Sequence, residues 1–190
     1  KAPGTSSEEQ VLVANVDVVL VITEPGADYS LRRMERYFAI IRRSGAQAVV
    51  VLNKADLFTK VECAQAAAEI RELNPDAAVH ITSVLEGQGL KVLRGYLKKG
   101  VTVALIGSSG VGKSAMINEI LGDEWQWVAD VNEVTGKGRH TTTARELIVL
   151  PRGGILVDNP GIKEGQMWTD EGTLRESFAD IEELAAQCRY

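Results

Sequence analysis

The chain has 190 residues, 45% hydrophobic residues and a net charge of -5, values that suit one globular core rather than a disordered chain. This acidic balance argues against an autonomous nucleic-acid binder, because phosphate contacts need a concentration of Lys and Arg. Two cysteines without metal-ligand spacing exclude a disulfide framework and a complete zinc site, and no apolar run reaches the roughly 20 residues of a membrane span, so we expect a cytoplasmic protein without membrane contact.

The predicted elements alternate between strands and helices. Short apolar runs predict buried parallel strands at 18–23, 48–52, 78–82, 101–106 and 155–157, and a further strand at 146–150. Helical periodicity predicts helices at 31–41 after a cap at Ser30, at 61–73 before Asn74-Pro75, and at 115–121. This alternation indicates an α/β fold with a doubly wound, mostly parallel sheet, in which ligands bind at the carboxyl ends of the strands.

The strand at 48–52 ends in Asn53-Lys54-Ala55-Asp56, a sequence suited to guanine. A carboxylate at Asp56 can accept from the ring N–H and the exocyclic amine of guanine, whereas adenine would leave this charge unpaired. We expect Asn53 to hold neighbouring loops and the far edge of guanine, and Lys54 to pack its stem across the base. A polar turn with a helix-capping Asp would look similar if the tetrapeptide stood alone.

The strand at 78–82 runs into a second loop that starts at Ser83-Val84. It is similar to the loop that backs guanine in GTPases, which makes Ser83 and the Val84 backbone amide candidate contacts. An ordinary turn between strand and helix is the alternative for this loop.

The strand at 101–106 leads into Gly107-Ser108-Ser109-Gly110-Val111-Gly112-Lys113-Ser114 and then a helix, which is a complete Walker A loop in its required context, the signature of a P-loop NTPase. Its backbone amides and the helix amino terminus attract phosphate oxygens, Lys113 is expected to reach the β and γ phosphates, and Ser114 to ligate Mg²⁺. The expected phosphate contacts are Gly107, Ser109, Gly110, Val111, Gly112, Lys113, Ser114 and Ala115. The loop alone does not choose between ATP and GTP.

Two downstream segments have the pattern of γ-phosphate sensors. Gly138-Arg139-His140-Thr141-Thr142-Thr143 offers a hydroxyl to Mg²⁺, with Thr143 preferred and Thr142 next, and Asp158-Asn159-Pro160-Gly161 offers a carboxylate to the metal through water and the Gly161 amide to the γ phosphate. Without the phosphate loop, the threonine run would be interpreted as a β-prone polar loop.

Ile162 follows Gly161, where many GTPases carry the Gln that orients the attacking water. An aliphatic side chain cannot orient water, so we expect slow intrinsic hydrolysis completed by another group. His140 is one candidate, and a solvated loop residue is the other interpretation of this histidine. His80, on an apolar strand, is expected to be structural.

Along the chain, the guanine motif comes first, the Walker A loop second and the two γ-phosphate sensors, the switch segments, last. This order is a circular permutation of the usual GTPase order. Together with Glu8-Glu9-Gln10-Val11 and Asn15-Val16-Asp17, these motifs make the chain resemble the ribosome small-subunit-dependent GTPase A family (RsgA, also called YjeQ) over nearly its whole length. The resemblance implies a GTPase that binds GTP/GDP and Mg²⁺, assists late maturation of the small ribosomal subunit, and is stimulated by that subunit and its rRNA.

The same resemblance suggests the domain organisation. Family members have an OB-fold before the GTPase domain and a zinc-binding domain after it, so we expect residues 1–10 to be a linker, 11–169 the permuted GTPase domain, and 170–190 an amphipathic helical segment. The first zinc ligand would fall at Cys188, so no zinc is expected in this chain, and ribosome contacts are expected mainly through the other domains. We expect a monomer.

Other functions stay open at this point. A nucleotide-dependent binding module without catalysis is compatible with Ile162, and a permuted GTPase of the large subunit is compatible with the motif order. The arginines of the helix at 31–41 and just after it could face rRNA, although a solvated helix face is the simpler interpretation. These arginines are Arg32, Arg33, Arg36, Arg42 and Arg43.

Overall fold

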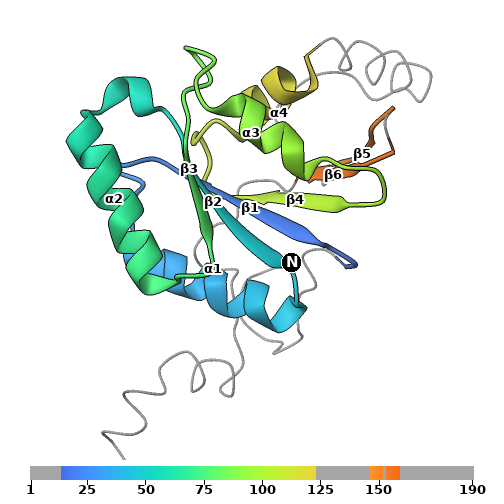
Figure 1. Cartoon of the computed structure of the whole chain (residues 1–190), viewed down its shortest axis with the longest axis horizontal. Helices are drawn as coiled ribbons and strands as arrows, with labels where there is room; N and C mark the ends of the chain where they lie inside the picture. The colour runs from blue at the N-terminus through green and yellow to red at the C-terminus, as the bar shows by residue number, and fades with distance from the viewer. Residues whose placement is uncertain (1–13, 123–145, 152, 159–190) are drawn as a thin grey trace, which may run out of the picture.

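The computed structural model describes residues 14–122, 146–151 and 153–158. Within these ranges the chain forms a six-stranded sheet in the order β3-β2-β1-β4-β6-β5 (Figure 1). The strands are β1 (Val18–Thr23), β2 (Gln47–Leu52), β3 (Ala78–Ile81), β4 (Thr102–Ile106), β5 (Glu146–Val149) and β6 (Ile155–Asp158). Neighbouring strands pair in parallel except β5, which is antiparallel to β6. The expected mostly parallel sheet is therefore confirmed.

The helices cover both faces of this sheet. They are α1 (Leu31–Ser44), α2 (Lys60–Leu73), α3 (Leu90–Leu93) and α4 (Lys113–Leu121), with short 3₁₀ turns η1 (Ala55–Leu57) and η2 (Arg94–Tyr96). Figure 1 shows α1 and α2 on one side and α3 and α4 on the other. The chain moves from β1 to β2 to β3 in one direction and then returns to β4, and right-handed crossovers place the returning helix on the opposite face.

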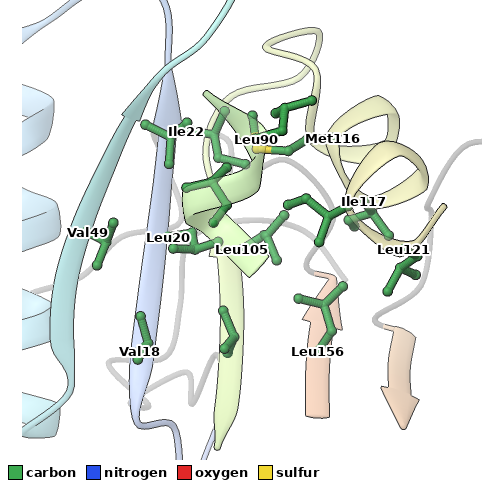
Figure 2. Close-up of a cluster of buried hydrophobic side chains, with 14 of the residues drawn as sticks. Val18, Leu20, Ile22, Val49, Leu90, Leu105, Met116, Ile117, Leu121 and Leu156 are labelled. Atoms are coloured by element: carbon green, nitrogen blue, oxygen red, sulfur yellow. The ribbon is translucent and has the colours of Figure 1, made fainter. Parts of the chain in front are cut away.

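Alternate side chains of the central strand β1 enter the two halves of the core. Val19 and Val21 pack with α1 and α2, whereas Leu20 and Ile22 pack with α3 and α4. Figure 2 shows the second group, in which Ile22 lies near Leu90 and Met116. Because both faces are buried, β1 is a continuous apolar run, and this makes its strand easy to predict from the sequence.

The helix ends follow the local sequence. The Ser30 hydroxyl accepts from the backbone of Arg33 at the start of α1, and Gly45 ends that helix in the left-handed conformation with φ of 73°. At the start of α2, Thr59 and Glu62 form a reciprocal capping box. The expected cap at Ser30 is thus confirmed.

Two features differ from the sequence analysis. The four-residue α3 and the turns η1 and η2 are too short to produce a detectable helical period. Arg33 does not belong to a solvated helix face: it is 8% exposed and forms an ion pair of 2.9 Å with Asp28. Arg32, Arg42 and Arg43 are exposed, which agrees with a solvated helix face.

No helix in the described part of the chain is long and apolar enough to cross a membrane. The expected linker at 1–10 and helical segment at 170–190 lie outside the described residues.

Candidate nucleotide-binding site

Three loops with the predicted motifs follow β2, β3 and β4 at the carboxyl edge of the sheet. Sheet order places β2 next to β3, and β1 between β2 and β4, so the loops gather at one end of four adjacent parallel strands. This is where nucleotides bind in doubly wound sheets. The base and phosphate motifs, 51 or more residues apart in the printed sequence, therefore belong to one site.

The phosphate loop after β4 depends on its glycines. Gly107, Gly110 and Gly112 have φ values of 150°, 85° and 98°, which L side chains rarely adopt. A Cβ on Gly107 would lie 2.3 Å from the carbonyl oxygen of Ile22, and one on Gly112 would lie 2.5 Å from Nδ2 of Asn53. The loop therefore approaches both the end of β1 and the base motif more closely than any side chain would permit.

Lys113 begins α4 and turns back over this loop. Its Nζ donates to the carbonyl oxygens of Gly107 at 2.9 Å and Ser108 at 2.7 Å, and the side chain is largely buried. Burial lowers the pKa of Lys113 below its ordinary value, while the carboxylates of Asp158 and Asp28 act in the opposite direction. A cation is thus held inside the loop whose backbone amides can receive phosphate oxygens.

Asn53 ties the three loops together. Its Nδ2 donates to the carbonyl oxygen of Val111 at 2.9 Å, and its Oδ1 accepts from the Thr82 hydroxyl at 3.1 Å. The backbone N–H of Ala55 also donates to the Thr82 carbonyl, at 3.0 Å. Asn53 is 2% exposed, so these bonds are shielded from water. Asn53 therefore contacts both neighbouring loops, while its expected contact with guanine stays a prediction.

Asp56 lies against the loop after β3. The buried Ser83 hydroxyl donates to Oδ1 of Asp56 and accepts from the backbone N–H of Glu86 at 3.1 Å. The sequence predicts that Ser83 contacts guanine. In the structure, the Ser83 hydroxyl donates to the carboxylate of Asp56, the residue that is itself expected to bind guanine. Val84 is half-buried and packs against the core, next to this contact.

Lys54 adopts an unusual backbone conformation. Its φ of 59° is in the left-handed region, and apart from Asn15 it is the one non-glycine residue with positive φ in the described ranges. Its Nζ forms an ion pair of 2.6 Å with Oε2 of Glu24, the residue directly after β1. Glu24 was not singled out from the sequence, although its position after a buried strand was an available signal.

The metal side of the site is described in part. Asp158 ends β6, pairs in register with Leu105 of β4 and is 4% exposed, so it lies beside the strand that carries the phosphate loop. Ser114 and Ala115, in the first turn of α4, are exposed. His140, Thr142, Thr143 and Gly161 lie outside the described residues. The roles of all these residues stay predictions.

Hydroxyl and carboxylate oxygens are suitable donors for Mg²⁺, which takes few protein ligands beside nucleotide phosphates. Ser114 and Asp158 therefore fit this metal chemically.

The strand order, the glycine-dependent phosphate loop after β4 and the base motif that precedes it in the chain define a circularly permuted P-loop GTPase fold. The solved structure of YloQ, described as a circularly permuted GTPase, has this fold with a TM-score of 0.59 at 24% identity, covering 93% of this chain and 55% of that one.

The model of the RsgA GTPase family matches residues 2–168, and the chain belongs to that family. It is similar to the crystal structure of YjeQ from Thermotoga maritima, with a TM-score of 0.67 and 27% identity over 88% of this chain and 56% of that one.

Curated relatives agree with this assignment. The chain is 46% identical to the small ribosomal subunit biogenesis GTPase RsgA of Opitutus terrae and 44% identical to the protein of the same name from Methanosarcina acetivorans. Both alignments cover 100% of this chain, but 52% and 51% of the relatives. The chain thus spans about half the length of these relatives.

Proposed function

We propose that the chain binds GTP and GDP, hydrolyses GTP, and serves assembly of the small ribosomal subunit. The observation that carries the proposal is the Asn53 side chain, which joins the base motif directly to the phosphate loop at Val111. A nucleotide has its base and its phosphates at opposite ends, and this contact holds the two corresponding protein segments at a fixed separation.

Asp56 is the group proposed to select guanine. Its carboxylate accepts from the Ser83 hydroxyl on one oxygen, which orients the side chain while lone pairs stay for the ring N–H and amine of the base. The Val84 amide and the stem of Lys54 would complete the contacts to the base.

The phosphate loop is proposed to hold the β and γ phosphates through its amides and Lys113. Mg²⁺ would be held by Ser114, by Thr143 or Thr142, and through water by Asp158, and would neutralise charge on the phosphates. Lys113 is already buried with two carbonyl partners, so exchange of these carbonyls for phosphate oxygens would strengthen its interactions.

Hydrolysis is proposed to be slow without a partner. Ile162 cannot orient water, and we propose that His140 or a group of the ribosomal subunit does so, with the Gly161 amide at the γ phosphate. The ribosomal role itself is suggested by the names of the two curated relatives, and it would place the protein in the cytoplasm.

Calorimetry and phosphate release test these proposals. The chain should bind GDP and GTP but not ADP, and Lys113→Ala should abolish binding, with the exposed Lys91→Ala on α3 as a charge-matched control. Purified small ribosomal subunits should accelerate phosphate release, and His140→Ala should remove that acceleration if His140 is catalytic. Absence of guanine-nucleotide binding by folded chain would refute the proposal.

Ile162 favours one second candidate, a nucleotide-dependent binding module that does not hydrolyse GTP. That candidate predicts GTP-dependent association with the subunit and no phosphate release above background. The two candidates therefore differ in one measurement made on the same mixture.

A further inference from the structure

We propose that Glu24 is a positioning residue for guanine recognition: its carboxylate holds the Lys54 ammonium, so that the Lys54 stem is fixed beside the base and its charge stays away from Asp56. This inference rests on the proposed binding of GTP and GDP, and it adds a residue that lies outside all of the nucleotide motifs.

The sheet places Glu24 next to the base motif. In the pairing of β1 with β2, Thr23 is opposite Leu52, and the backbone N–H of Asn53 donates to the Thr23 carbonyl at 2.8 Å. The two strands therefore end together, and the residues that follow them, Glu24 and Lys54, meet in an ion pair of 2.6 Å. The side chain of Glu24 is 16% exposed and that of Lys54 is 33% exposed, so water screens the pair only partly.

The neighbouring loop contacts keep Glu24 in this place. Gly26 lies so close to the Phe58 ring, just after η1, that a Cβ on Gly26 would be 2.6 Å from Cζ of Phe58. Asp28, the other acidic residue of the same loop, is paired with Arg33 at 2.9 Å. The loop is thus packed against the end of the base motif, with Asp28 engaged elsewhere and Glu24 engaged with Lys54.

An ion-pair partner should improve the contact of Lys54 with the base. A lysine side chain has many rotamers, and ordering them on binding costs affinity, so a stem that is held in advance forms a better surface for the base. Lys54 is also separated from Asp56 by one residue. An ammonium that moved to Asp56 would neutralise the carboxylate proposed to select guanine.

The test is GDP affinity of the whole chain, measured by calorimetry at low salt. Glu24→Gln should weaken GDP binding by roughly two- to fivefold, the range of a partly exposed ion pair. The direction of this change in GDP affinity is informative, because removing a negative charge from the protein should by itself strengthen the binding of an anionic ligand. Glu72→Gln, an exposed residue of α2, provides the control for that general effect and should bind GDP at least as tightly as the wild type.

A double-mutant cycle separates positioning from a merely structural role. Lys54→Met keeps most of the stem and removes the ammonium, so the loss caused by Glu24→Gln should disappear in the Lys54→Met background. If Glu24→Gln weakens GDP binding equally in both backgrounds, or not at all in the wild-type background, the inference is wrong. Circular dichroism checks the fold, and Glu24→Asp replaces Glu24→Gln in the cycle if the latter unfolds.

Failure of the inference and failure of the proposed function give different results. A wild-type chain that binds GDP, with no coupling between positions 24 and 54, overturns only the role of Glu24. A folded wild-type chain that binds no guanine nucleotide overturns the proposed function, and the role of Glu24 with it.

Discussion

The side-chain amide of Asn53 and the backbone carbonyl of Val111 are joined by a hydrogen bond of 2.9 Å across 58 positions of the chain. Together with the bond from Thr82 to Asn53, it makes one buried side chain a direct connection between the base motif, the loop after β3 and the phosphate loop.

Asn53→Ala should lower both stability and nucleotide affinity. It leaves the Val111 carbonyl and the Thr82 hydroxyl buried without this partner, at a cost of about 1–3 kcal/mol in the free energy of unfolding. GDP affinity should fall at least tenfold, because the loops are no longer held together. Thermal melting and calorimetry measure the two effects. Asn118→Ala, at an exposed position of α4, should change neither, and an Asn53→Ala chain with wild-type affinity would contradict the prediction.

Gly112→Ala should damage the same contact from the other side. The new Cβ would lie 2.5 Å from Nδ2 of Asn53 in a backbone with φ of 98°, so both a collision and strain arise. We expect a loss of roughly 1–3 kcal/mol in stability and a large loss of GDP binding.

Gly100→Ala is the matched control, since it has φ of 77° and no atom within 4 Å of the added Cβ. It should show backbone strain alone, about 1 kcal/mol, with GDP affinity unchanged. Equal GDP affinities for the two variants would show that the collision with Asn53 has no consequence.

Asp56→Asn should change the preferred base. The amide presents a donor where guanine also has donors, so GDP affinity should fall by roughly two orders of magnitude, while xanthosine diphosphate, with a carbonyl at that place, should gain. Competition binding with both nucleotides measures the ratio. Unchanged selectivity for GDP would argue strongly against the proposed role of Asp56.

The pH dependence of stability should contain a contribution from His80. Its Nε2 lies 2.8 Å from the Tyr96 hydroxyl, and burial, followed by the nearby Arg71, lowers the pKa of His80 below its ordinary value. His80 therefore binds a proton more readily in the unfolded chain than in the folded chain. Its contribution to the free energy of unfolding is present above the pKa of His80 in the unfolded chain and is lost as the pH falls through its pKa in the folded chain. Melting temperatures from pH 8 to pH 5 should fall less steeply for His80→Gln than for the wild type, and parallel curves would contradict this assignment.

The elements and the site were predictable to different extents. The Walker A loop and the Asn53–Asp56 motif could be assigned because each is contiguous and its spacing follows from the ligand it is proposed to contact. The support of Asp56 by Ser83 and the pairing of Lys54 with Glu24 could not, because each joins two loops whose separation depends on strand register.

Arg33 illustrates a limit of periodicity. Helical spacing places Arg33 near other arginines, but Arg33 is buried and forms an ion pair with Asp28, on a loop that has no helical period. The switch residues Thr143 and Gly161 stay predictions from their motifs alone, since the structure does not describe those segments.

The strand order of the sheet has a consequence for synthesis of the chain. β2 and β3 each pair with the strand made just before them, so this half of the sheet can form from nearby contacts as the polypeptide emerges. β4 has to return across them to β1, and only then can Val111 meet Asn53. A bound nucleotide should therefore selectively stabilise molecules in which β4 has paired with β1 and Val111 has met Asn53.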